Sequence, residues 1–182
     1  MRLLLPLLMC AAAAAMPASA MSPEEAYAAI PHQRTTFDAK SSTLSPAQVE
    51  SLQRLFALSD QGVILRVEGM RAQRSRDATE LKRVLLAYDK LVENLQAQPL
   101  AGEVAPARDL IVKALRDHKR YIASKPEGGM QFVRNEISTS ADVTQASKSL
   151  QQAYNLLMRT FPGEAARNKS SFYDYLCALD YL

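Results

Sequence analysis

The stretch that follows the first helix signal combines side chains that could recognise a ligand. Residues 31–38 read PHQRTTFD and place His32, Arg34, Phe37 and Asp38 in a segment without helix or strand periodicity. Irregular segments often display binding groups on a rigid scaffold, and an arginine can form a two-pronged pair with a carboxylate or a phosphate. We therefore expect these four residues to contact a partner or ligand. In the alternative, Phe37 closes one end of the helical domain while Arg34 and Asp38 pair internally.

His118 offers a second kind of chemistry. It is one of only two histidines and falls on the apolar side of an expected helix. Exported four-helix proteins can hold a b-type haem between His and Met, so Met70 and Met158 are the matching candidates. The alternative is a core histidine with packing methionines. A c-type haem needs C-x-x-C-H, which is missing, and two histidines without H-x-x-x-D/E spacing predict no metal site.

Positive charge gathers between residues 66 and 83. We expect Arg71, Arg74 and Arg76 to face a partner there. The whole set comprises Arg66, Arg71, Arg74, Arg76, Lys82 and Arg83, with Glu68, Asp77 and Glu80 among them, a local balance of +3. A solvated helix junction accounts for such a cluster, and an anionic partner or membrane surface is the alternative. No aromatic residues alternate with these charges, which argues against nucleic acid.

The sequence motifs of common enzyme classes are missing. We find no G-x-S-x-G, no G-x-x-x-x-G-K-[ST], no H-E-x-x-H and no G-x-G-x-x-G. A pair of carboxylates for general acid–base catalysis has no fixed spacing in sequence. An enzyme with an unrecognised site therefore remains an alternative, with no catalytic residue nominated.

Composition limits the class of protein. The 182 residues are 48% hydrophobic and carry a net charge of +3, with six glycines and no tryptophan. A chain of this length usually forms one domain. The small net charge excludes a strongly basic nucleic-acid binder and an acidic disordered tail.

Residues 1–20 resemble a cleaved signal peptide. Arg2 precedes an apolar run, and Ala18-Ser19-Ala20 supplies a small-x-small cleavage site. We expect a periplasmic or secreted protein, with lipidation at Cys10 as the alternative. No later apolar run is long enough for a transmembrane helix. Cleavage would leave Cys177 as the one cysteine, either buried in a helix or bridging two copies of the chain.

Helix signals recur along the rest of the chain. The spacing of apolar residues, helix caps and Pro/Gly breaks predicts helices over 23–30, 46–70, 77–97, 106–124, 140–161 and 171–182. We expect an all-α fold: an antiparallel four-helix bundle (45–182) preceded by a short helix and irregular arm (21–44). No Gly or Pro separates 46–70 from 77–97, so a hairpin and one bent helix both remain open.

The last expected helix is apolar on two sides. Phe172, Tyr175, Leu176 and Leu179 fall on one stripe. Such a helix must be covered by its own domain or by a partner. We expect it to dock on the bundle, with a homodimer through this helix as the alternative.

One short motif has a familial counterpart. Leu44-Ser45-Pro46-Ala47-Gln48 is similar to the L-T-x-x-Q motif of small, exported, all-helical stress chaperones. A helix cap with Gln at the third position accounts for the same residues, and we assign no family from it.

These observations favour an exported helical protein that binds a protein partner without catalysis, as an adaptor, an inhibitor or immunity-type protein, or a chaperone. The first alternative is a carrier of a small molecule or cofactor such as haem b. The second is the enzyme with an unrecognised site.

Overall fold

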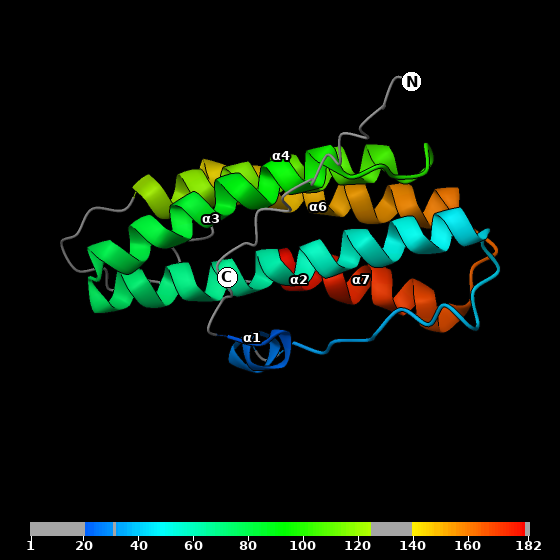
Figure 1. The fold of residues 1–182 in the computed structure, drawn as a ribbon, viewed down its shortest axis with the longest axis horizontal. Coiled ribbons are helices and arrows are strands. Elements are labelled where there is room, and N and C mark those ends of the chain that lie inside the picture. The colour runs from blue at the N-terminus through cyan, green and yellow to red at the C-terminus, as the bar shows by residue number, and fades with distance from the viewer. Residues whose placement is uncertain (1–20, 31, 125–139, 181–182) are drawn as a thin grey trace, which may run out of the picture.

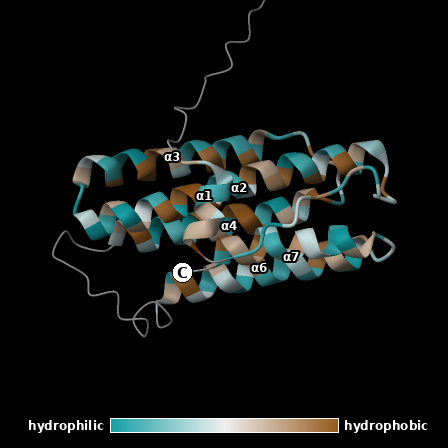
Figure 2. Ribbon diagram, turned by 90° about the horizontal axis from the view of Figure 1, so that it is seen from below, coloured by the Kyte–Doolittle hydropathy of each residue, from teal (hydrophilic) through white to brown (hydrophobic). Residues whose placement is uncertain are grey.

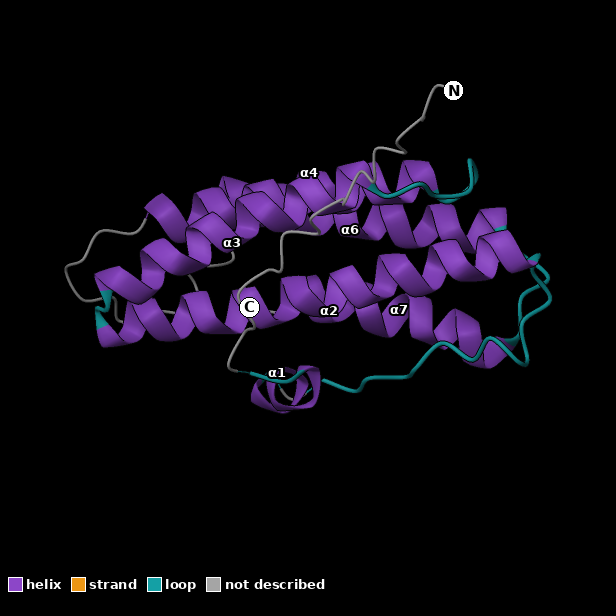
Figure 3. Ribbon diagram, viewed as in Figure 1, coloured by secondary structure: helices purple, strands orange, loops and turns teal. Residues whose placement is uncertain are grey.

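The fold is all-helical in the ranges that the computed structural model describes, residues 21–30, 32–124 and 140–180 (Figure 3). No strand occurs in these ranges. The helices are α1 (Pro23–Ala29), α2 (Pro46–Ser75), α3 (Ala78–Ala97), α4 (Ala105–Ser124), α6 (Ala141–Thr160) and α7 (Ala166–Asp180). The expected signal peptide with Cys10, and the stretch between α4 and α6, lie outside the described residues.

Capping boxes start the first two helices. The Ser22 hydroxyl accepts from the Glu25 N–H at 3.2 Å, and the Glu25 carboxylate accepts from the Ser22 N–H at 2.8 Å. Ser45 and Gln48 repeat this exchange at 3.4 and 3.0 Å. Each box satisfies backbone N–H groups that a helix start leaves open. In the second box, local capping accounts for the Ser-Pro-Ala-Gln motif.

α2 and α3 form a hairpin, which decides between the two alternatives. Arg76 ends α2 in the left-handed conformation, with φ 57° and ψ 33°. Asp77 then starts α3, because its carboxylate accepts from the Glu80 N–H at 2.9 Å. A non-glycine residue in this conformation costs about 1 kcal/mol. The turn could therefore not be predicted from the sequence, since neither Gly nor Pro occurs at it.

α2 is the central helix and is buried on nearly all sides between Ser59 and Gly69. It packs against α1, α3, α4 and α7. The other long helices keep one apolar and one polar side, and Figure 2 shows these as alternating brown and teal bands. A helix surrounded by neighbours needs no polar face.

α7 lies beside both α2 and α6 and packs on each (Figure 1). It begins at Ala166, so the expected start at residue 171 is wrong. The Ser171 side chain is buried and donates to the Asn168 carbonyl at 2.6 Å. The expected start was late because the first turn of α7 is polar, with Arg167, Asn168 and Lys169, and has no apolar stripe.

The apolar stripe of α7 faces the interior of the chain. Phe172, Tyr175, Leu176 and Leu179 are all buried. This removes the reason for expecting a homodimer through that stripe, because the stripe is already covered. Cys177 is a free thiol at an intermediate depth, not fully buried as one alternative had it.

Among the described residues, every helix is too short or too polar to span a bilayer.

Candidate functional site

Residues 32–44, here called the arm, lie along α2 and α7 after α1 (Figure 1). Arg34 fastens the arm to α2. Its guanidinium meets both carboxylate oxygens of buried Asp60, at 2.5 and 3.3 Å. Tyr27 donates to the same carboxylate at 3.0 Å. The two-pronged pair expected of Arg34 is therefore internal, and its partner is Asp60 rather than Asp38.

Aromatic rings add to this fastening. The Arg34 guanidinium carbon lies 5.8 Å from the centre of the Tyr27 ring and 5.7 Å from that of Tyr175. Phe37 is 6% exposed, and its ring centre lies 5.9 Å from that of Phe56 and 6.3 Å from that of Phe172. Phe37 thus packs into the core, as the internal alternative predicted for it.

Polar side chains of α7 hold the backbone of the arm. Asp174 accepts from the Thr35 N–H at 3.0 Å. Asn168 accepts from the Asp38 N–H at 2.8 Å and donates to the Asp38 carbonyl at 3.0 Å. His32 Nε2 lies 3.1 Å from the Asp174 carbonyl oxygen. An arm without secondary structure must find such partners for its backbone groups, and α7 supplies them.

Glu164, just before α7, holds the end of the arm. It accepts from the Ser42 hydroxyl at 2.5 Å and from the Thr43 N–H at 3.4 Å. Burial alone would raise the pKa of this carboxyl, but hydrogen bonds from Ser42, the Ala165 N–H and Asn168 outweigh burial and lower it. The carboxylate is therefore charged when it binds the arm.

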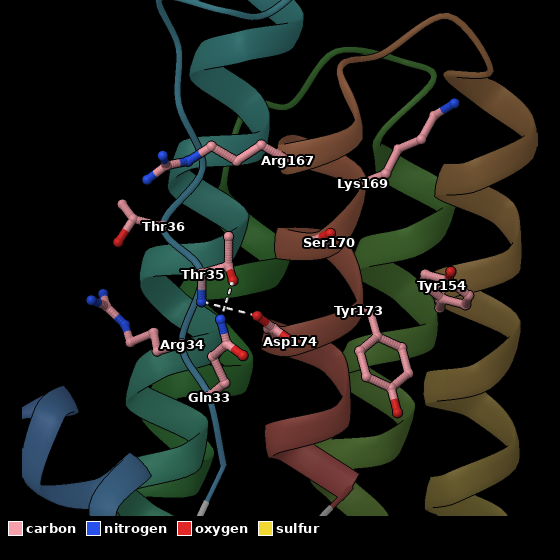
Figure 4. A pocket seen from close by; sticks show the side chains of 10 residues that line it. All are labelled: Gln33, Arg34, Thr35, Thr36, Tyr154, Arg167, Lys169, Ser170, Tyr173 and Asp174. Atoms are coloured by element: carbon pink, nitrogen blue, oxygen red, sulfur yellow. Dashed lines mark hydrogen bonds between the residues drawn. The ribbon is translucent and has the colours of Figure 1, made fainter.

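A groove of about 770 Å³ opens where the arm, α6 and the outer side of α7 meet. Its lining is polar, as Figure 4 shows: hydroxyl groups of the arm on one side, Arg167 and Lys169 at the start of α7, and Tyr154 of α6 on the other side. Arg34 also borders the groove, but its guanidinium is turned toward Asp60. Arg34 thus directs most of its hydrogen-bond donors to Asp60 and not to the groove.

A second groove of about 450 Å³ follows the seam between α6 and α7. Tyr154 and Tyr173 line both grooves, so the two are neighbours and meet at this pair. The two rings meet edge to face, with centres 5.8 Å apart and planes at 77°. Leu150, Leu176 and Cys177 make this second part less polar.

Tyr173 is the exposed aromatic residue of the groove. Its side chain is 51% exposed, and among the described residues Leu86, at 54%, is the other large hydrophobic residue exposed to this degree. Leu86 lies on α3 and lines neither groove. Tyrosine at the centre of a groove is typical of residues that dominate binding energy.

The charges around the groove favour an anion. Arg167 and Lys169 lie at its rim and extend in opposite directions (Figure 4). The Lys169 ammonium donates to the Pro162 carbonyl, which leaves Arg167 as the cation turned to solvent. Asp174 is the acidic residue in the lining of the first groove, and its buried carboxylate accepts from the Thr35 N–H and is thereby turned toward the arm.

Comparisons with protein-family models, with curated proteins and with solved structures find no match to this chain. Its function must be inferred from its own residues.

The basic cluster lies at the α2–α3 turn, away from this groove. Arg71, Arg74 and Arg76 are exposed there, as expected of residues that face solvent or a partner. Arg83 binds both Glu68 and Glu80, each at 2.6 Å. The structure does not bring this cluster together with the binding groups of the groove.

Arg66 does not belong to that solvated cluster. It is 2% exposed and reaches through the core to the end of α7. Its guanidinium donates to the Leu179 carbonyl at 2.7 Å and also binds His118 Nε2. Burial lowers the pKa of Arg66 to about 10. The residue thus stays charged at neutral pH and stabilises the negative end of the α7 dipole.

His118 is buried with this arginine. Burial first, and then the charge of Arg66, hold the pKa of His118 well below its ordinary value. The imidazole is therefore neutral and accepts from Arg66 through Nε2, a nitrogen that a haem iron would need. Met70 and Met158 are partly buried and pack against the core. This geometry favours the core interpretation of all three haem candidates.

A metal site gains no support from the described part of the chain, where no three His, Cys, Asp or Glu residues gather in a suitable cluster.

Sequence reasoning named the arm but missed the residues that face it. Asp60, Asn168 and Asp174 are buried polar residues on otherwise apolar sides of helices. That pattern is a usable signal, because buried polar groups need partners. Tyr154 and Tyr173 gave no such signal, since tyrosine occurs both in protein cores and at surfaces.

Proposed function

We propose that this chain is an exported, non-catalytic binding protein that captures a protein partner in the two neighbouring grooves formed by the arm, α6 and α7. The observation that supports it best is the exposed Tyr173, packed edge to face on Tyr154 in an open groove. Adaptor, inhibitor and chaperone roles all use such a surface.

The scaffold of this proposal is an antiparallel four-helix bundle of α2, α3, α4 and α6. In it, α7 fills the side between α2 and α6, on both of which it packs. The groove would then lie on a rigid outer surface, since Arg34, Asn168 and Asp174 already fix the arm to α2 and α7. A surface held in place before binding loses less entropy when a partner arrives.

The experiment is affinity capture from the native host, with the tagged chain expressed with its own N-terminus. Tyr173→Ala should reduce recovery of a stoichiometric partner at least about tenfold, the effect of losing a dominant interface residue. Leu86→Ala, a matched change on α3, should leave recovery unchanged. Equal recovery with both variants would overturn the proposal.

Arg34→Ala and Phe37→Ala are poor probes of binding for this protein. Both side chains hold the arm to the core, through Asp60 and through the rings of Phe56 and Phe172. Loss of capture in these variants would therefore report on folding as much as on recognition. Tyr173 avoids this problem because half of its surface is exposed.

A further inference from the structure

The lining of the two grooves changes in character along α7. At the start of α7, Arg167 and Lys169 give it positive charge. At the end of α7 the groove is less polar, because Tyr173 and the partly exposed Cys177 line it over the buried Leu150 and Leu176, with Lys148 and Asp180 of opposite charge at its border. Tyr173 lies between these two halves. A ligand that fits both halves must itself change from anionic to apolar along its length.

The length of the groove suits an extended chain. From Arg167 to Asp180, α7 runs about 20 Å at a rise of about 1.5 Å per residue. An extended peptide covers this distance with about six residues at about 3.3 Å each. The two grooves follow one another along α7 and share the tyrosine pair. A single extended strand of peptide is long enough to contact both.

The charged half selects carboxylates. The lining holds one acidic residue, Asp174, which is turned toward the Thr35 N–H, against the two cations Arg167 and Lys169. Arg167 is exposed, and an arginine pairs with carboxylates through two parallel hydrogen bonds. The hydroxyl group of Thr36 adds a donor nearby. This is charge complementarity toward Asp and Glu side chains.

We infer that the groove takes an extended acidic segment of the partner, about six residues long, with its carboxylates at the Arg167–Lys169 end and an apolar or aromatic side chain at the Leu150–Leu176 end. The inference rests on the proposed function and specifies the chemistry of the partner. Tyr173 would contact the middle of the segment, and its hydroxyl and ring edge can serve both halves.

The test is fluorescence anisotropy with the purified chain and two fluorescein-labelled peptides. The probe is Gly-Asp-Glu-Asp-Ser-Phe-Leu-Gly, and the control replaces its acidic residues by Asn and Gln. The acidic peptide should bind about tenfold more tightly than the amide peptide, and Tyr173→Ala should weaken it about tenfold. Arg167→Glu should weaken it about fivefold, and added salt should weaken it further.

Lys113→Glu on α4 is the matched control, because it makes the same change in net charge at an exposed position away from the groove. It should leave the affinity for the acidic peptide unchanged. Equal affinity for both peptides, or no binding of either, would overturn the inference. If the peptides give such a result but capture of the partner still depends on Tyr173, the proposed function stands and the inference of an acidic partner segment is wrong. If capture is also independent of Tyr173, both fail.

Discussion

Single residues decide whether the arm stays on the core. Arg34 is the clearest case, because its guanidinium meets Asp60 through two nitrogens and lies between two tyrosine rings. The Asp60 side chain is 7% exposed. A carboxylate at that depth is stable only while it is paired. The pairing, and not a ligand, therefore explains why an arginine occupies this position.

Arg34→Ala should destabilise the protein by about 2 kcal/mol, since it leaves the Asp60 carboxylate buried with one hydrogen bond from Tyr27. Urea unfolding followed by circular dichroism measures the change. Arg54→Ala is the control, because the pair of Arg54 with Glu50 is exposed and should contribute little. Equal stability of the two variants would mean that the arm is not held through Asp60.

His118 should make the protein sensitive to mild acid. Its pKa is depressed in the folded state, so the unfolded chain takes up a proton first, near the ordinary pKa of about 6.5. The contribution to stability is full above that pH and is lost as the pH falls. Between pH 7.5 and 5.0 the free energy of unfolding should drop by up to about 2 kcal/mol from this residue.

His118→Gln tests this, because glutamine keeps an acceptor for Arg66 but does not titrate. Urea unfolding at both pH values should show a smaller acid-induced loss in the variant than in the wild type. The second histidine, His32, is present in both chains, so its contribution cancels. The same loss in both proteins would show that His118 is not the acid-sensitive group.

Among the helices, the packing of α2 against α7 depends on a close approach at Gly62. A Cβ at Gly62 of α2 would lie 2.7 Å from Leu179 Cδ2 on α7 and 3.0 Å from Leu115 Cδ2 on α4. Both leucines are fully buried. The glycine therefore lets these helices approach closely, and it serves packing rather than a bend, because α2 continues without a break through this position.

Gly62→Ala should destabilise the protein by about 1–2 kcal/mol. Crowding of the two leucines outweighs the gain of about 1 kcal/mol that alanine normally brings to a helix. Gly102→Ala, where a Cβ meets nothing within 4 Å, should be close to neutral. Thermal unfolding of both variants compares them, and a stabilised Gly62→Ala would contradict the close approach of α2 and α7.

Several elements could be predicted from the sequence because their signals are local. Ser22 with Glu25 and Ser45 with Gln48 mark helix starts within four residues. The start of α7 could not be found in this way, since its first turn is polar and its buried residue there, Asn168, is held by the distant arm. The α2–α3 turn was equally hidden, because Arg76 adopts a conformation that usually belongs to glycine.

At the scale of the whole molecule, the candidate site arises from contacts that no local pattern contains. Asp38 and Asn168 are 130 residues apart, and Thr35 and Asp174 are 139 apart. The arm was predicted to contact a partner or ligand, and its residues 33–36 form one wall of the groove. Tyr173 and Arg167, which face solvent there, belong to a helix that the sequence presented mainly as apolar.

The most direct measurement is photo-crosslinking of the full chain in its native host. Tyr173 is replaced by p-benzoylphenylalanine, and in a second protein Leu86 is replaced in the same way. The two positions have almost equal exposure, on α7 and α3 respectively. If the groove captures a protein partner, irradiation gives one dominant adduct at position 173 and none at position 86. Adducts at both positions, or at neither, would contradict a partner site in the groove.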